Sequence, residues 1–315
     1  MKLVFMGTPE FSVPAFEALL SGGHTVEAVV TQPDKPRGRG KEMQETPVKQ
    51  AALAHKIPVL QPERVRGNEE FLEQLRKINP DVIVVIAFGQ ILPKEVLELP
   101  RYGCINIHAS LLPKYRGAAP IQWVIIDGET ETGITTMYME EGLDTGDMLL
   151  KTAVPIAEDE TGGSLHDKLA AAGGPLILET LRGLEAGTLK RTPQTGETCY
   201  AKILTKSLGK IDWSMDAVSI ERLIRGLSPW PSAYGYLGKK TVKFWKAEVC
   251  DGEGMEPIKG GRPGTVAAVT KGRILIQTGK GFLAVKELQL EGKKRMDAGS
   301  FLRGYPLKAG DRMEG

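Results

Sequence analysis

Asn106 and His108 are the residues whose types and spacing first suggest chemistry. They stand in the apolar run Cys104-Ile105-Asn106-Ile107-His108, where alternate side chains of an extended strand share one face. Pro113 cannot sit in a central ladder, so the chain leaves the sheet there, and strand ends are where open α/β sheets bind ligands. Two interpretations stand level for the pair: a polar ligand site, or a hydrogen-bonded core histidine beside a turn-forming asparagine.

Asp144 lies in a second polar motif, Gly142-Leu143-Asp144-Thr145-Gly146-Asp147, between strands predicted over residues 133–139 and 148–155. Such a motif is usually only a turn, since Asp and Gly are preferred turn residues. Its place between two strands nevertheless lets it fold back over the end of the sheet.

The elements that must position these residues follow an α/β pattern. Residues 2–6 predict a buried strand, 11–20 a helix and 26–31 a second strand, which is the start of a parallel, Rossmann-like sheet. Only Gly7 of the dinucleotide fingerprint G-x-G-x-x-G is present, and this disfavours a nicotinamide cofactor. Further helices are predicted over 47–55, 68–78, 119–126 and 164–186, and further strands over 57–60 and 81–86.

The strand at 81–86, DVIVVI, is so uniformly apolar that both its faces must be covered. The segment FGQILP at 88–93 follows it and is expected beside the exit of the Asn106/His108 strand. An apolar wall for an aromatic ligand and simple core filling are both compatible with this segment.

Residues 32–46, QPDKPRGRGKEMQET, combine two prolines and two glycines with four cations. This composition suits no packed element and predicts a mobile surface loop. The loop is either an ordinary connection or a segment that grips phosphates and orders on binding.

The rhythm of the sequence changes near residue 206. A helix over 215–227 and a last one over 297–303 flank short strands at 241–249, 264–269, 273–278 and 282–288, which predicts a small antiparallel barrel of OB type. The expected organisation is a first domain over 1–187, a linker over 188–205 and a second domain over 206–315.

Composition sets the broad class. A length of 315 residues with 41% hydrophobic residues suggests two globular domains. No apolar stretch reaches membrane-spanning or signal-peptide length, so a cytoplasmic location is expected. The three cysteines and four histidines are scattered, and neither a disulfide framework nor a structural metal is expected.

The formal charge is divided unevenly. Residues 1–205 have a balance of −6, whereas residues 206–315 carry 20 Lys and Arg against 12 Asp and Glu, a balance of +8. A basic domain fits contact with nucleic acid, although a solvated face explains most lysine-rich segments.

Three motifs together resemble the signature of folate-dependent formyltransferases: Asn106-x-His108, SLLP at 110–113 with RGAAP at 116–120, and the Gly142 to Asp147 motif. Within that superfamily, QPDK at 32–35 with GRGK at 38–41, IDW at 211–213 and PWP at 229–231 resemble the branch that acts on methionyl-tRNA. The likeness covers nearly the whole chain.

The resemblance implies a catalytic trio of Asn106, His108 and Asp144, with 10-formyltetrahydrofolate as donor and initiator methionyl-tRNA as acceptor. It implies a folate pocket lined by Phe88, Gly89, Ile91, Leu92, Ser110, Leu111, Leu112 and Pro113. The tRNA would meet the barrel and the loop at 32–49, through Lys35, Arg37, Arg39 and Lys41. A monomer without a metal is expected.

The residue types suit this chemistry. Formyl transfer to an amine passes through a tetrahedral intermediate whose oxygen becomes negative, and the Asn106 amide and a protonated His108 can donate to that oxygen. Asp144 would orient His108 and, directly or through a water, accept the proton of the amine.

Three alternatives compete with this hypothesis. The same chemistry on an amino sugar or purine precursor is disfavoured by the basic second domain and the cationic loop. A non-catalytic RNA-binding protein would not need the trio, and a nicotinamide oxidoreductase lacks its glycine fingerprint.

Overall fold

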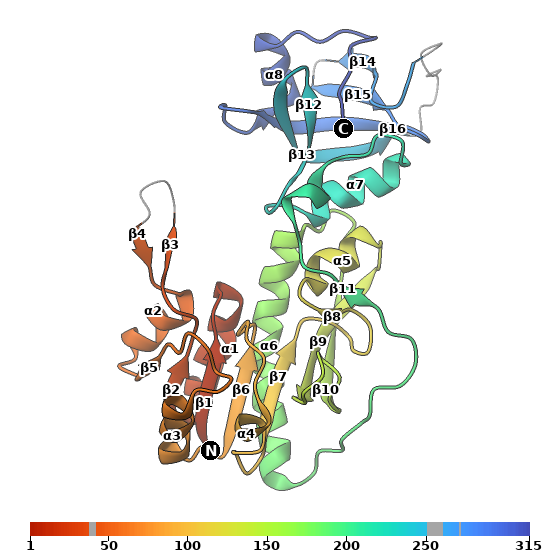
Figure 1. Cartoon of the computed structure of the whole chain (residues 1–315). Coiled ribbons are helices and arrows are strands. Elements are labelled where there is room, and N and C mark those ends of the chain that lie inside the picture. The colour runs from red at the N-terminus through yellow and green to blue at the C-terminus, as the bar shows by residue number, and fades with distance from the viewer. Residues whose placement is uncertain (38–41, 251–260, 271) are drawn as a thin grey trace. The chain divides into compact units, whose positions relative to one another are not determined.

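The computed structural model describes residues 1–37, 42–250, 261–270 and 272–315. The chain divides into two compact units, each of which draws on several segments (Figure 1). The N-terminal unit comprises Met1–Pro120, Glu131–Pro155 and His166–Ala201, and the C-terminal unit comprises Ile121–Thr130, Ile156–Leu165 and Lys202–Gly315. In the described ranges, no helix has both the length and the apolar character needed to cross a membrane.

A seven-stranded sheet forms the centre of the N-terminal unit, in the order β10-β9-β7-β6-β1-β2-β5 (Figure 1). Its strands are β1 (Lys2–Gly7), β2 (Thr25–Val30), β5 (Val59–Leu60), β6 (Val82–Ile86), β7 (Cys104–His108), β9 (Glu131–Tyr138) and β10 (Met148–Pro155). Pairing is parallel from β7 to β5, whereas β9 is antiparallel to both β7 and β10. The predicted mostly parallel α/β sheet is therefore confirmed.

The order of the strands explains where a site can form. From β1 the chain builds outward through β2 to β5, and then returns to the other side of β1 to build β6 and β7. Open sheets bind ligands outside the carboxyl ends of their strands where the order reverses in this way. All five residues of β6 are buried, as the apolar run predicted, and β6 pairs with β7, so the segment after β6 starts beside the end of β7.

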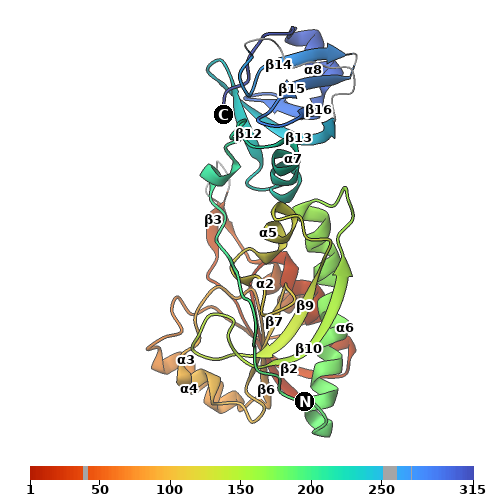
Figure 2. The ribbon, with the colours of Figure 1, turned by 90° about the vertical axis from the view of Figure 1, so that its right-hand side faces the viewer.

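Helices and short elements surround the sheet: η1 (Glu10–Ser12), α1 (Val13–Ser21), α2 (Pro47–Ala54), α3 (Glu69–Ile78), α4 (Lys94–Leu97) and α6 (Gly162–Ala186). Figures 1 and 2 show α6 running along the sheet. Its contact is close, because Thr180 and Thr136 of β9 share a hydrogen bond of 2.8 Å and a Cβ on Gly173 would lie 3.5 Å from Ile107. A two-stranded parallel ladder joins β8 (Arg116–Gly117) to β11 (Tyr200–Ala201).

The cationic segment at 32–46 differs from the predicted loop. Instead of a loop without regular structure, β3 (Lys35–Arg37) and β4 (Glu42–Gln44) form an antiparallel ladder in which Lys35 pairs with Gln44. A ladder of two strands has only edge strands, and an edge tolerates Pro36, which a central strand would not. The predicted tRNA contacts Arg39 and Lys41 lie outside the described residues, as does the side chain of Arg37.

The C-terminal unit contains an antiparallel sheet in the order β12-β13-β16-β15-β14, with β17 paired to β16. Its strands are β12 (Ala233–Leu237), β13 (Lys240–Cys250), β14 (Val266–Thr270), β15 (Arg273–Gln277), β16 (Phe282–Leu290) and β17 (Met296–Asp297). Its helices are α5 (Pro120–Ile126), η2 (Lys206–Gly209), α7 (Ala217–Gly226) and α8 (Ala298–Gly304). Strands β12 and β17 were not predicted from the sequence.

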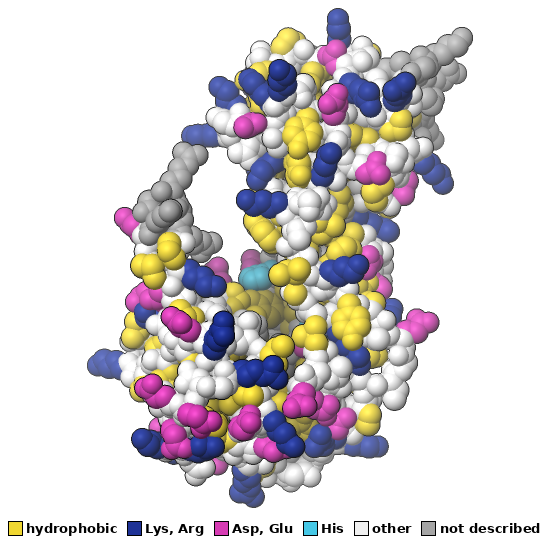
Figure 3. Space-filling view, viewed as in Figure 1, with side chains coloured by type: hydrophobic (Ala, Val, Ile, Leu, Met, Phe, Trp, Pro, Cys, Tyr) yellow, Lys and Arg dark blue, Asp and Glu magenta, His cyan; other side chains and the backbone are white. Residues whose placement is uncertain are grey.

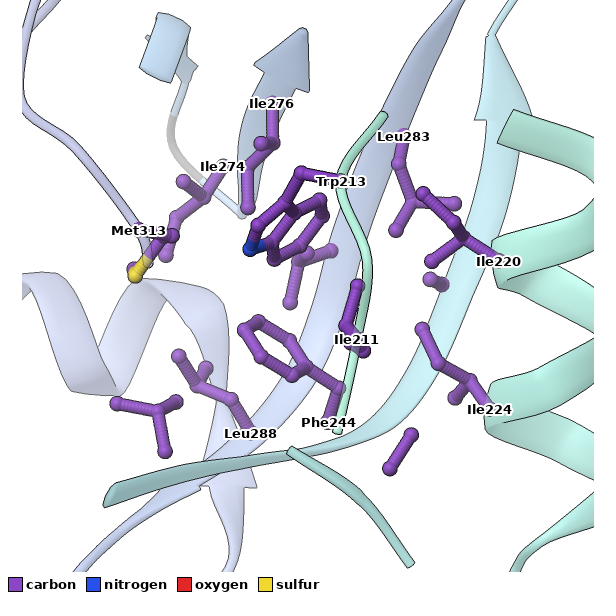
Figure 4. Close-up of a cluster of buried hydrophobic side chains, with 14 of the residues drawn as sticks. Ile211, Trp213, Ile220, Ile224, Phe244, Ile274, Ile276, Leu283, Leu288 and Met313 are labelled. Carbon is purple, nitrogen blue, oxygen red and sulfur yellow. The ribbon is translucent and has the colours of Figure 1, made fainter. Parts of the chain in front are cut away.

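The core of the C-terminal unit lies between this sheet and α7 (Figure 4). The rings of Trp213 and Phe244 meet edge to face, with centroids 5.5 Å apart, and Met313 packs beside them. The predicted antiparallel second domain is thus confirmed, but no ladder closes it into a barrel within the described ranges. Single bridges instead join Tyr236 to Glu314 and Thr265 to Arg312, so the end of the chain contacts both edges of the sheet.

Both signs of charge are interspersed over both units on the face that Figure 3 shows. The balance of +8 in residues 206–315 is therefore an excess of cations, 20 Lys and Arg against 12 Asp and Glu, on a surface that also carries acidic side chains.

Cys104, at the start of β7, provides a test of this packing. Burial raises the pKa of its thiol to about 12, so at pH 8 almost none of it is the reactive thiolate. We expect iodoacetamide to modify the exposed Cys199 in the native protein and to leave Cys104 unmodified until denaturant is added, as read by peptide mass spectrometry. Equal native rates at the two cysteines would contradict the packing of β7.

Candidate active site

His108 is the last residue of β7, and its ring is held on one side by the main chain. The side chain is buried, and Nε2 lies 2.9 Å from the carbonyl oxygen of Tyr115. A carbonyl can only accept a hydrogen bond, so Nε2 carries the proton of this contact. Nδ1 is therefore the ring atom turned toward the rest of the site.

Asp144 faces this ring atom. Its Oδ1 lies 3.7 Å from Nδ1 of His108, within ion-pair distance but beyond a hydrogen bond, and its Oδ2 accepts a hydrogen bond of 2.8 Å from the Gly117 amide. The Asp144 backbone has φ of 52°, in the left-handed region that Asp tolerates better than most residues. The segment from 139 to 147, which we call the Asp144 loop, thus brings this carboxylate to the end of β7.

Asn106 lies on the same face of β7 as His108, as the alternation of the strand predicted. Its side chain is half-buried, and no hydrogen-bond partner for its amide is found among the described residues. Both amide N–H groups are therefore free to donate to a bound molecule. The alternation of the strand predicted the shared face of Asn106 and His108, the resemblance predicted Asp144 as their partner, and in the structure Asp144 faces His108.

The segment after β7 is tied down at several points. Thr135 of β9, which is fully buried, donates to the Ser110 carbonyl at 2.7 Å and accepts from the Leu112 amide at 3.2 Å. The Ser110 hydroxyl donates to the Lys114 carbonyl at 2.7 Å, and Lys151 donates to the Leu112 carbonyl. These contacts fix the path of the predicted folate segment over 110–113.

The other predicted wall, after β6, has two kinds of residue. Phe88 and Leu92 are almost fully buried in the core that covers β1 and β6, whereas Gly89 and Ile91 are exposed. Gln90 fastens this turn to the preceding loop, accepting from the Val65 amide at 2.9 Å. Part of the predicted wall is therefore core, as the alternative interpretation held.

A cavity of about 470 Å³ adjoins this turn. It is lined by Ile91 and Leu92, by Glu141 of the Asp144 loop, and by cationic side chains that include Arg66 and Lys94. Of the eight residues predicted for the folate pocket, only Ile91 and Leu92 line this cavity.

The base of the cationic hairpin is fixed, although its tip lies outside the described residues. Lys49 donates to Asp34 at 2.5 Å, and Gln61 donates to the same carboxylate at 2.7 Å. These hydrogen bonds, that from Lys49 first, hold the pKa of Asp34 below its usual value. The predicted contact Lys35 is exposed on β3.

Several residues that support the site were missed from the sequence. Tyr115 and Gly117 act through main-chain atoms, which leave no signal in residue type. Thr135 could have been found, because a strand pairing antiparallel with β7 places a threonine opposite His108. Gln194, from the segment between α6 and β11, donates to the Asp144 carbonyl at 2.8 Å. Apart from its polar side chain, nothing in the sequence around Gln194 indicated this contact.

Around the end of β7, the structure brings together the Asn106 amide, the His108 imidazole and the Asp144 carboxylate. Such a set can stabilise negative charge that develops on an oxygen and accept a proton from a nucleophile. Among the described residues, no three His, Cys, Asp or Glu side chains come together in a way that could hold a metal ion.

Two family models match the chain. Residues 1–181 match the model described as Formyl transferase, and residues 203–306 match that described as Formyl transferase, C-terminal domain. The methionyl-tRNA formyltransferase of Agathobacter rectalis is 56% identical over 311 residues, which cover 98% of this chain and 98% of that protein. The one of Geobacter metallireducens is 52% identical over 314 residues, covering 99% and 98%.

Solved structures show the same fold at low identity. The N-formyltransferase of Helicobacter canadensis, in complex with folinic acid and dTDP-3-aminofucose, aligns with a TM-score of 0.65 at 18% identity, covering 94% of this chain and 100% of that one. HypX of Aquifex aeolicus, in complex with tetrahydrofolic acid, aligns with a TM-score of 0.63 at 20% identity, covering 100% and 51%.

Thr135 is expected to contribute strongly to stability. Replacing it by valine keeps the shape but leaves the buried Ser110 carbonyl and Leu112 amide without their partner, at about 1–3 kcal/mol each. Urea unfolding should therefore show Thr135→Val destabilised by roughly 2–6 kcal/mol, and Thr135→Ser, which keeps the hydroxyl, by about 1 kcal/mol or less. Equal losses in the two variants would contradict the role of the hydroxyl.

Proposed function

The chain belongs to the formyl transferase family, and from that premise we propose that it transfers a formyl group from 10-formyltetrahydrofolate to the α-amino group of methionine on initiator methionyl-tRNA. The observation that carries the proposal is the meeting of His108 and Asp144 at the end of β7, beside an Asn106 amide with free donors. This is the set of groups that formyl transfer to an amine requires.

Asn106 and His108 act on the oxygen of the formyl group. When the amine attacks the formyl carbon, this oxygen becomes negative, and a donor aimed at it contributes about 2.7–4 kcal/mol. The Asn106 amide can donate without giving up another contact, and Nδ1 of a protonated His108 adds a charged donor. The Tyr115 carbonyl keeps the ring in the orientation that this role needs.

Asp144 is the proton acceptor in this scheme. The attacking amine must lose a proton, and the carboxylate, which faces Nδ1 of His108, is the basic group placed to accept it, directly or through a water. The donors and the acceptor supply the charge stabilisation of this scheme, so no step in it calls for a metal ion. All three side chains come from one chain, and we propose that a monomer is sufficient.

The folate substrate is proposed to bind between the turn after β6 and the segment after β7. The cavity lined by Ile91, Leu92 and Glu141 supports this, because it joins the predicted wall to the Asp144 loop. Exposed Gly89 offers main-chain atoms at the same turn, and the anchored backbone of 110–113 offers a rigid opposite side. The buried Phe88 and Leu112 shape the site from beneath.

The tRNA is proposed to meet residues 206–315 and the hairpin of β3 and β4. The balance of +8 in the former and exposed Lys35 on the latter support contact with phosphates, to which Arg37, Arg39 and Lys41 are proposed to contribute. A role in the start of translation would place the protein in the cytoplasm.

A small acceptor is the second enzyme hypothesis, because sugar formyltransferases share the fold. The two relatives named above, at 56% and 52% identity over nearly the full chain, carry the name methionyl-tRNA formyltransferase, which favours the tRNA. The trio disfavours a non-catalytic RNA-binding protein.

Substituting the trio should remove turnover without unfolding the protein. We expect Asn106→Ala to lower kcat by about 10²–10³ through loss of an oxyanion donor, and His108→Ala and Asp144→Asn to lower it by about 10²–10⁴. Formylation of methionyl-tRNA is measured under saturating folate, and unfolding midpoints check the fold. His166→Ala, a histidine outside the site, is the control. Near-normal turnover in any trio variant removes that residue from the mechanism.

The acceptor can be tested directly. Purified protein is given 10-formyltetrahydrofolate with initiator methionyl-tRNA, elongator methionyl-tRNA or a nucleotide-linked amino sugar. We expect formylation of the initiator tRNA only, with affinity falling steeply as salt rises because phosphate contacts release counterions. Equal use of both tRNAs would overturn the specificity, and turnover of the sugar alone would overturn the tRNA proposal.

A further inference from the structure

Gln194 joins two parts of the candidate active site. It lies in the connecting segment, residues 187–199, between α6 and β11, and its side chain is half-buried. Its Oε1 accepts hydrogen bonds from Nε and Nη2 of Arg116, at 2.9 and 2.7 Å. Its Nε2 donates to the carbonyl oxygens of Asp144 and Gly146, each at 2.8 Å.

Only an amide satisfies all of these contacts. The Arg116 guanidinium offers donors and therefore needs an acceptor, whereas the two carbonyls need donors. A carboxylate at position 194 would keep the pair with Arg116 but would face the two carbonyls with a negative oxygen. The four contacts also fix which end of the Gln194 amide is nitrogen.

The Asp144 loop needs such an external partner. It has no helix or strand of its own, and Asp144 is held in the left-handed region, with φ of 52°. Gly146 lies so close to β9 that a Cβ on it would be 1.9 Å from the Tyr138 carbonyl. A strained, tightly seated loop persists only where surrounding groups fix it.

The partners of Gln194 also flank the contact that orients the catalytic carboxylate. Arg116 precedes Gly117, whose amide donates to Oδ2 of Asp144 at 2.8 Å. Gln194 thus holds the main chain at Asp144 and the residue next to the Gly117 donor. One amide side chain fixes both ends of the Gly117 to Asp144 hydrogen bond.

We propose that Gln194 is a positioning residue that sets the carboxylate of Asp144 against His108. It acts through Asp144 and does not touch the substrate, so its effect on turnover rests on the proposed function. Its effect on the position of the Asp144 loop does not depend on the proposed function.

The connecting segment has other anchors, so Gln194 is not needed merely to attach it. Arg191 pairs with Asp147 at 2.9 Å, Thr192 forms a bridge with Met148, and the Thr198 hydroxyl donates to the Pro113 carbonyl at 2.6 Å. Loss of the Gln194 amide should therefore shift the Asp144 loop while the segment stays docked.

The test compares Gln194→Glu and Gln194→Ala with Thr195→Ala, a substitution at the exposed neighbour. The glutamate keeps the contact with Arg116 and loses the two donors to the loop. We expect kcat for formylation to fall on the order of 10- to 100-fold in both Gln194 variants, as for a misplaced catalytic group, with KM little changed and Thr195→Ala unaffected. Wild-type kcat in Gln194→Glu would overturn the proposal.

A double-mutant cycle separates positioning from a general loss of structure. In the Asp144→Asn background, which has already lost the carboxylate, Gln194→Ala should cause no further fall in kcat, because the two residues act as one unit. A further fall as large as that in the wild-type background would mean that Gln194 does not act through Asp144, and would overturn the proposal.

Hydrogen exchange keeps this inference separate from the proposed function. If the wild-type chain does not formylate methionyl-tRNA, the proposed function fails, and exchange of peptides covering 139–147 still tests the role of Gln194. Both Gln194 variants should exchange faster there than the wild type and Thr195→Ala. Unchanged exchange in the Gln194 variants would overturn the proposal.

Discussion

The site depends on the hydrogen bond between the Gly117 amide and the Asp144 carboxylate. Because β9 runs antiparallel to β7, its last residue, Tyr138, lies beside Ile105 near the start of β7. The Asp144 loop therefore begins near the start of β7, whereas His108 is at the end of that strand. To reach His108, the loop must fold back over the polar face of β7. No ladder guides that return, so individual contacts have to hold it, and the one at 2.8 Å from Gly117 ends on the carboxylate that is proposed to act in catalysis.

The backbone from 110 to 117 consequently contacts both His108 and Asp144. Its Tyr115 carbonyl accepts from His108, and its Gly117 amide donates to Asp144, so one stretch of main chain sets the relation of ring to carboxylate. A hydrogen bond to a charged group contributes about 1.5–3 kcal/mol, which is lost if the stretch moves. The buried Thr135 hydroxyl, which fixes the start of this stretch, therefore matters to the site without touching its reacting groups.

The sequence predicted those features that depend on pattern. Alternation placed Asn106 and His108 on one face, and the unbroken apolar run of β6 predicted a fully covered strand. Features that depend on tertiary contact were missed. The prolines, glycines and cations of residues 32–46 predicted a structureless loop in place of the hairpin of β3 and β4, yet a ladder of edge strands accepts Pro36. The contacts at Tyr115, Gly117 and Gln194 join residues far apart in the chain or use atoms common to every residue.

The three side chains of the candidate active site differ in whether they already have hydrogen-bond partners. In the described structure, Nε2 of His108 and Oδ2 of Asp144 each have a main-chain hydrogen-bond partner, whereas the Asn106 amide has none. Rearranging the first two during a reaction would cost the contacts that position them, but Asn106 can gain hydrogen bonds without losing any. In the proposed mechanism, the most favourable place for new negative charge is therefore beside Asn106, and His108 and Asp144 are already oriented when that charge develops.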